Sequence, residues 1–174
     1  MVTLRGDMVY LRALEKEDLN FLYELENNSK VWEISGTVTP YSKDVLQLYL
    51  DNAHRDIYDV KQLRLVISNY EHKAIGLIDL FDFDPNHKRA GMGIVIHDEL
   101  QRNKGVGAEA ITLFCNYAFE VLGLRQVYAN ILEDNSASMH LFQKLGFIPV
   151  GVKQDWVRLG NSYKNEILLQ KINR

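Results

Sequence analysis

The sequence is poor in cysteine, in proline and in net charge. A single cysteine, Cys115, excludes an internal disulfide, so the fold must be stabilised by its core, and a reducing cytoplasm is the localisation we expect. The 20 basic and 23 acidic side chains leave a net charge of −3. Because this balance provides no large basic surface, we expect no nucleic-acid partner.

Long apolar runs are also missing. No stretch approaches the roughly 20 apolar residues of a membrane span, and residues 1–7 contain no basic region followed by an apolar run. We therefore expect an intracellular protein with no membrane partner. Since 47% of the 174 residues are hydrophobic, the chain suffices for one substantial core, and we predict a single domain over residues 1–174.

Metal-ligand spacing is a third absence. His87, His97 and His140 show no such spacing with one another or with Cys115, so we expect no metal. Cys115 falls in the middle of a predicted helix, where packing in the core is the role we expect for it.

The central feature that is present is a glycine-bearing segment at residues 101–108, between an apolar run and an amphipathic one. Gly105 and Gly107 lack a Cβ, which allows the backbone to curl and direct several N–H groups toward one point. The helix that follows adds the positive end of its dipole, and Arg102 and Lys104 add full charges. We interpret this segment as a pyrophosphate-binding site.

Other interpretations of these glycines fit less well. Residues 105–110 match the dinucleotide pattern Gly-x-Gly-x-x-Ala, but eight mostly polar residues separate Gly105 from the preceding strand, whereas a dinucleotide site has its glycine directly after the strand. A nucleoside-triphosphate loop ends in Gly-Lys-Ser/Thr, and here the order is Lys104-Gly105-Val106. An ordinary loop before a helix remains the alternative.

Two segments together resemble the GNAT acetyltransferase superfamily. Residues 101–107 are similar to its acetyl-CoA signature, Gln/Arg-x-x-Gly-x-Gly/Ala, and residues 135–147 are similar to its segment Asn-x-x-(Ala/Ser)-x-x-x-(Tyr/Phe)-x-Lys-x-Gly-Phe. The resemblance extends over residues 11–168. It implies acetyl-CoA as co-substrate, bound by Gln101, Arg102, Asn103, Lys104, Gly105, Val106 and Gly107.

Hydrophobic periodicity and turn residues predict an α/β (α+β) fold. We expect strands at 8–14, 62–68, 74–83, 89–96, 126–131, 148–157 and 163–170, and helices at 15–27, 42–58, 105–121 and 135–145, with a loop at 28–41. With the resemblance, this order implies the GNAT fold: a mixed, mostly antiparallel sheet of six to seven strands, flanked by about four helices, with splayed central strands.

In the resembled family the strand corresponding to 89–96 diverges from its neighbour, and pantetheine inserts between the two strands. The resemblance therefore assigns the backbone of Ile94, Val95 and Ile96 to pantetheine binding. Gly91 and Gly93 on this strand indicate a bulge or a close backbone approach.

Two residues of the second motif have a dual interpretation. Asn135 can cap the next helix and also bind pantetheine, and Lys144 can contact the CoA phosphates or remain a solvated lysine.

Acetyl transfer to an amine requires a proton acceptor, because an amine with a pKa near ~10.4 is almost fully protonated at neutral pH. Asp79 shares a strand face with Leu77 and Phe81, and apolar neighbours would raise its pKa toward that of a useful base. Asp82 is the second candidate, although it also fits the surface end of a strand. Polyamine acetyltransferases of the resembled family carry acidic residues at matching positions.

The proton donor for the thiolate departs from the family pattern. Many relatives have tyrosine where this chain has Phe142, which has no proton to donate. Ser138 lies one helical turn earlier on the same face and is the nearest hydroxyl, while Tyr128 is a second candidate.

The activity implied is N-acetyl transfer from acetyl-CoA to a primary amine, either of a polyamine-like small molecule or of a protein N-terminus. Glu26 and Glu33 either line the acceptor side or belong to solvated helix ends. An acyl-CoA-binding module with weak catalysis is the alternative, because Phe142 replaces the usual donor. The sequence does not exclude a homo-oligomer.

Overall fold

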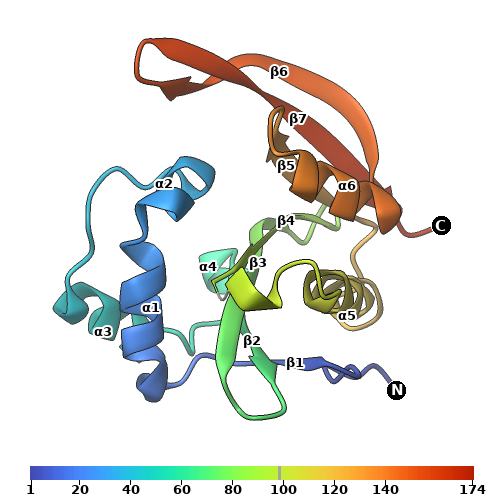
Figure 1. The fold of residues 1–174 in the computed structure, drawn as a ribbon. Helices are drawn as coiled ribbons and strands as arrows, with labels where there is room; N and C mark the ends of the chain where they lie inside the picture. Colours follow the sequence, from blue (N-terminus) through green and yellow to red (C-terminus); the bar gives the residue numbers. More distant parts are fainter. Residues whose placement is uncertain (98) are drawn as a thin grey trace.

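The computed structural model describes residues 1–97 and 99–174. The described residues form one sheet of seven strands in the order β1-β2-β3-β4-β5-β7-β6 (Figure 1). The strands are β1 (Val9–Arg12), β2 (Leu63–Asn69), β3 (Ala74–Asp84), β4 (Arg89–Ile96), β5 (Gln126–Leu132), β6 (Ile148–Leu159) and β7 (Ser162–Ile172).

The sheet consists of two antiparallel parts joined by one parallel contact. Strands β1 to β4 pair antiparallel in sequence order, and β5, β7 and β6 form the second antiparallel part. The parallel contact between β4 and β5 covers only the pairs from Arg89↔Gln126 to Gly91↔Tyr128. The predicted sheet is confirmed, including the separation of its central strands.

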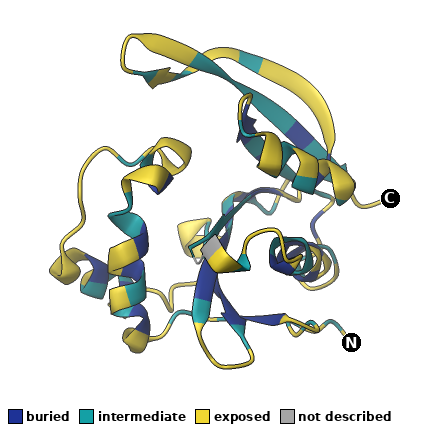
Figure 2. Cartoon of the chain, in the orientation of Figure 1, coloured by how far each residue is buried: buried dark blue, intermediate teal, exposed yellow. Residues whose placement is uncertain are grey.

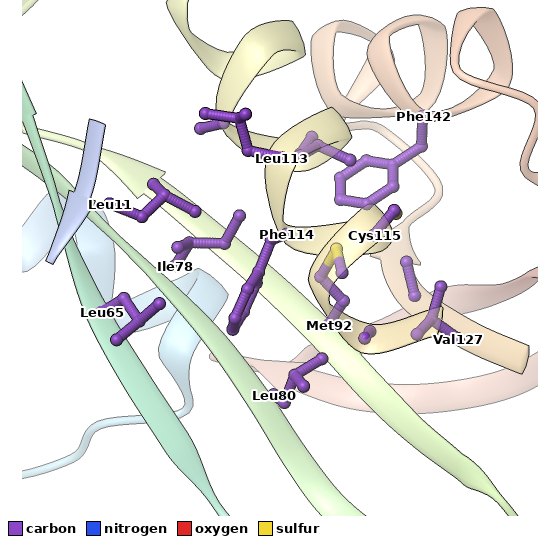
Figure 3. Close-up of a cluster of buried hydrophobic side chains, with 14 of the residues drawn as sticks. Leu11, Leu65, Ile78, Leu80, Met92, Leu113, Phe114, Cys115, Val127 and Phe142 are labelled. Atoms are coloured by element: carbon purple, nitrogen blue, oxygen red, sulfur yellow. The ribbon is translucent and has the colours of Figure 1, made fainter. Parts of the chain in front are cut away.

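Helices cover both faces of the sheet (Figure 1). One face carries α1 (Leu19–Glu26), α2 (Ser29–Ser35) and α3 (Lys43–Asp51), whose apolar residues form a core with Val66 and Leu77. The other face carries α5 (Val106–Glu120) and α6 (Ser136–Lys144) over a larger core, and Figure 3 shows Phe114 and Cys115 of α5 meeting the side chains of the central strands. The short elements are η1 (Lys16–Asp18), α4 (Ile57–Val60) and η2 (Glu99–Gln101).

Two of the expected boundaries were wrong. The predicted loop at 28–41 contains α2, because the side chain of Asn28 accepts a bond from the Lys30 N–H at the helix start and Gly36, with φ 73°, ends the helix. The predicted helix at 42–58 is α3 followed by the separate turn α4, which Asp56 caps.

Of the two glycines of β4, Gly91 marks a close approach and Gly93 does not, and the bulge lies on the partner strand. The register between β3 and β4 shifts between Phe81 and Asp84. An ideal Cβ on Gly91 would lie 2.2 Å from Cε2 of Phe81, so the aromatic ring lies directly over that glycine.

Strand β6 of the last hairpin is more exposed than the other strands. Figure 2 shows β6 exposed along most of its length, while the central strands are buried. Among the described residues, no helix is long and apolar enough to cross a membrane.

Candidate active site

A cleft opens where β4 and β5 separate. Beyond the pair Gly91↔Tyr128 the two strands no longer pair, and a cleft of about 440 Å³ lies between them. Its floor is made by residues of both strands, Met92, Gly93 and Ile94 from β4 and Ala129, Asn130, Ile131 and Leu132 from β5.

The unpaired edge of β4 points its backbone into this opening at alternate residues. The N–H of His97 donates to the carbonyl of Ile75 at 2.9 Å, so the odd-numbered residues of the strand bond to β3. Ile94 and Ile96 therefore direct their N–H and C=O groups toward β5. The backbone of Val95 faces β3 and its side chain packs against the α1–α3 core, so Val95 does not contribute a group to the open edge.

The glycine-bearing segment leads directly from this edge into α5. Asn103 and Gly105 adopt left-handed backbone conformations, with φ 61° and 85°, and the helix begins at Val106. In the part of the chain that the structure describes, the first-turn N–H groups of Val106, Gly107 and Ala108 have no hydrogen-bond partner, as is usual at a helix start.

Gly107 places the start of α5 beside the cleft. A Cβ there would be in ordinary contact with Cδ2 of Leu141 at 3.4 Å and with Cδ1 of Ile94 at 3.9 Å, so the start of α5 lies next to both β4 and α6. The free amides thus lie beside the cleft. A diphosphate attached to pantetheine fits this arrangement, because the helix start offers N–H donors and a positive dipole end.

Arg102 and Lys104, both expected to add positive charge to the pyrophosphate-binding site, are placed differently from each other. Arg102 turns its guanidinium back to the carbonyl of Ile96, with Nη2 at 3.1 Å and Nε at 3.3 Å. Lys104 is exposed, and Gln101 is half-buried at the end of η2. Arg102 therefore ties the segment to the end of β4 and does not extend freely into solvent.

The first turns of α6 form one wall of the cleft. Asn135 caps the helix by accepting a bond from the Ser138 N–H at 3.2 Å, and Asn135, Ser138 and Phe142 all line the cleft. Lys144 is exposed at the other end of the helix and does not line it.

Phe142 fills the position where a hydroxyl was expected from the family pattern. Its side chain is buried, and its ring packs edge-to-face on Phe147 with centroids 4.9 Å apart. Ser138 provides a hydroxyl in the same wall. Tyr128 lies outside this cleft in a separate hollow, where burial and then the charge of Asp82 raise its pKa.

The apolar surroundings expected for Asp79 were wrong. Both carboxylate oxygens accept bonds from Arg64, at 2.7 Å from Nε and 3.0 Å from Nη2, and the same guanidinium donates to Glu26 at 2.9 Å. Arg64 is the cross-strand neighbour of Asp79 on β2, and Gly93 is its neighbour on β4. Burial would lower the pKa of Arg64, but Asp79 and Glu26 raise it above its ordinary value.

Asp82 is located away from the cleft. It lies in the bulge of β3 with φ 48°, and it is exposed beside Lys61 and Arg89 in the hollow that also contains Tyr128. The expectation that Asp82 lies at the reacting centre was wrong. The structure supports the alternative interpretation, in which Asp82 lies at the surface end of a strand.

The opposite wall comes from α2 and from the β6–β7 hairpin. Glu33 lines the cleft, as one of the two interpretations expected. The sequence did not single out Trp156, Arg158 and Glu166 of the hairpin, which also line it. Trp156 is 59% exposed in its strand, but this exposure is visible only in the structure, so the sequence carried no signal for it.

Both carboxylates of this wall are paired with lysines of the hairpin. Lys153 donates to Glu166 at 2.8 Å and to Asn130 at 3.1 Å. Lys164 binds Glu33 and also lies 2.6 Å from Asp134. Across the described ranges, no group of three or more His, Cys, Asp or Glu side chains is arranged to hold a metal ion.

Comparisons with known proteins agree with this geometry. The family model of the acetyltransferase (GNAT) domain matches residues 9–148. Spermidine N(1)-acetyltransferase of Escherichia coli K12 is 33% identical over 159 residues, which cover 91% of this chain and 83% of that protein. The Vibrio cholerae enzyme of the same name is 32% identical over 141 residues, covering 81% of this chain and 79% of that protein.

A solved structure also matches almost the whole fold. The spermidine N-acetyltransferase of Vibrio cholerae, crystallised in complex with CoA and spermine, superposes with a TM-score of 0.84 at 25% identity, covering 94% of this chain and 95% of that one. The family match over most of the chain, together with an open strand edge next to a helix start, leads to one conclusion: the chain belongs to the GNAT acetyltransferase family and is an acetyl-CoA-dependent N-acetyltransferase.

Proposed function

We propose that this enzyme acetylates a primary amine of a small, polyamine-like acceptor in the cleft between β4 and β5. The observation that carries the proposal is the position of Glu33 and Glu166, which line the cleft wall opposite α6. Lys164 and Lys153 pair with these carboxylates, but each carboxylate has further lone pairs that can accept hydrogen bonds from an acceptor amine. The named relatives act on spermidine, which favours a small amine over a protein N-terminus as acceptor.

Acetyl-CoA supplies the acetyl group as an activated thioester. Ile94, through its N–H and C=O, and Ile96, through its N–H, would hold pantetheine at the open edge of β4, and the amides of residues 106–108 would hold the diphosphate. Asn135 and Ser138 would contact pantetheine from the α6 wall, since both line the cleft. Arg102 would stay close to the diphosphate while bonded to Ile96.

The acceptor amine must lose a proton before it can attack. We keep Asp79 as the proposed acceptor of that proton, acting through water in the space beside Gly93, where an added Cβ would meet only Phe81 within 4 Å. Arg64 keeps the Asp79 carboxylate oriented. Glu166 is the competing carboxylate because it lies in the cleft wall itself.

The departing thiolate needs little assistance. A thiol of this kind has a pKa near ~8.5, so its thiolate is a fair leaving group even without a strong acid nearby. Ser138 is the hydroxyl that we assign to this end of the cleft, in place of the tyrosine that Phe142 replaces.

The experiment that tests the function is an acceptor screen. Purified protein and acetyl-CoA are incubated with monoamines, diamines, triamines and peptides with free N-termini, and mass spectrometry detects a gain of one acetyl group. We expect acetylation of small amines. Calorimetric binding of CoA with no acetylated product in any reaction would instead indicate the binding-only module.

The Gly105→Asp variant is the binding control for this screen. Gly105 has φ 85° in the proposed diphosphate-binding segment, directly before α5. An aspartate there adds both backbone strain and a negative charge. We expect it to lose CoA binding and turnover together. We also place the enzyme in the cytoplasm, where a free thiol such as the buried Cys115 stays reduced.

A further inference from the structure

Lys164 of β7 connects three segments of the chain, of which α2 contributes Glu33 to the cleft. Its ammonium group binds the carboxylate of Glu33 on α2 and lies 2.6 Å from Asp134, which immediately precedes α6. In Figure 1 the β6–β7 hairpin arches across the molecule toward α2, which brings these segments together. The two carboxylates raise the pKa of Lys164, first through the hydrogen bond with Asp134, so the amine is held in its charged form.

This bridge belongs to the acceptor side of the cleft, because Glu33 is one of its lining residues. The other lining carboxylate, Glu166, is neutralised by Lys153 at 2.8 Å. Arg158, which also lines the cleft, adds a positive charge. Within the described residues, each carboxylate of the lining is therefore already matched by a lysine ammonium group.

The Lys164 side chain, which bridges Glu33 and Asp134, resembles the end of a polyamine. The tip of a lysine side chain is a primary ammonium on an alkyl chain, as is each end of an α,ω-diamine. Glu33 and Asp134 would hold such a group in the same way as they hold Lys164.

We propose that Lys164 is a specificity-determining residue that limits the positive charge of the acceptor. The ammonium group of Lys164 holds Glu33 and Asp134, and so occupies the position that a second ammonium group of the acceptor would take. The wild-type enzyme therefore favours acceptors with fewer positive charges over longer polycations. This inference rests on the proposed acetylation of small amines. It names the feature of the cleft that sets the preference among those amines.

The test compares kcat/KM for a monoamine, a diamine and a triamine of matched carbon-chain length. Lys164→Met removes the ammonium group and keeps the length of the side chain. We expect it to raise the ratio of triamine to monoamine kcat/KM about tenfold, mainly through a lower KM for the triamine, because two carboxylates become available. Lys164→Arg keeps the charge and should retain the wild-type ratio.

Two further variants separate this role from a purely structural one. Glu33→Gln added to Lys164→Met should remove most of the gain for the triamine, because one carboxylate is lost. Lys16→Met, on the exposed helix η1, is the matched lysine control and should leave the ratio unchanged. The Kd of CoA and the melting temperature are measured for every variant, and Lys164→Gln serves as the second neutral substitution if the methionine variant does not fold.

The outcomes distinguish the two levels of the account. Lys164→Met could lower kcat/KM equally for all three amines, or leave the triamine-to-monoamine ratio unchanged. Either result would mean that Lys164 is only a structural contact between α2 and the hairpin, and the inference would be overturned. If neither wild type nor variant acetylates any amine, the proposed function itself fails.

Discussion

At the scale of single residues, the carboxylates at the site are held by basic side chains, and these ion pairs limit how each carboxylate can act. Asp79 is held at both oxygens by Arg64, whereas Glu166 in the cleft wall is held by Lys153. Phe142 offers no proton, and Ser138 is left as the hydroxyl of that wall. The carboxylates in and beside this cleft are therefore ion-paired, and a mechanism that uses them must start from the paired state.

Replacing Asp79 and Glu166 separately identifies the proton acceptor. We expect Asp79→Asn to lower kcat by about 10²-fold or more with little change in the Kd of CoA, in line with the usual size of general-base effects. Glu166→Gln should change mainly the KM of the amine. The reverse pattern, with kcat lost only in Glu166→Gln, would transfer the base role to Glu166.

Cys115 provides a residue-scale test of burial. The thiol is 1% exposed on α5, and burial raises its pKa to about 11. A thiol with this pKa is almost entirely protonated at pH 8, so the native protein should react with an alkylating reagent far more slowly than the protein unfolded in guanidinium chloride. Equal rates in the two states, measured by mass spectrometry, would contradict the buried position.

At the scale of elements, most of the boundaries could be predicted because their signals are local. The strand 89–96 and the helix between Asn135 and Gly146 were predicted to within a residue, since a capping side chain and a left-handed glycine mark the helix ends. Helix α2 was missed because Gly36 and the proline at position 40 outweighed the cap at Asn28.

The pairings of the site were not predictable in the same way. Arg64 meets Asp79 only through the register of β2 on β3, and Lys164 meets Glu33 across 131 positions of sequence. No local pattern of residues indicates either contact. The family resemblance named Ile94, Asn135 and Ser138, which line the cleft, but it named neither the residues that β5 contributes nor the ion pairs of Glu33 and Glu166.

The connection from β1 into α1 depends on a buried ion pair. Asp18 accepts bonds from Arg12 at 2.8 and 2.9 Å and from the Glu15 N–H at 2.8 Å. Burial would raise the pKa of Asp18, but these hydrogen bonds outweigh it and lower that pKa. Because the folded-state pKa is lowered, the stabilisation is complete above the unfolded-state pKa of about 3.9 and is lost as pH falls through the folded-state value.

We therefore expect Asp18→Asn to destabilise the protein by about 2–3 kcal/mol at pH 7, somewhat less than a fully buried pair because Arg12 is partly exposed. Urea unfolding between pH 3 and pH 8 measures this difference. It should be constant from pH 5 to pH 8 and should shrink below pH 4. A difference that does not change at low pH would contradict the role of the charged carboxylate.

At the scale of the whole molecule, the cleft exists because the sheet is in two parts. Strands β1 to β4 with α1–α3 form one side, and β5 to β7 with α6 form the other, with only three residue pairs of parallel pairing between β4 and β5. Helix α5 lies over the larger core beneath the junction. The hairpin then returns across the opening to α2, where Lys164 pairs with Glu33, and the proposed acceptor site lies between the two parts.

The most direct test of this account is a crystal structure of the protein with acetyl-CoA. We expect the diphosphate at the free amides of residues 106–108 and pantetheine alongside β4, bonded to the N–H and C=O of Ile94 and to the N–H of Ile96. A bound molecule at another surface, with no bond to the backbone of Ile94, would contradict it.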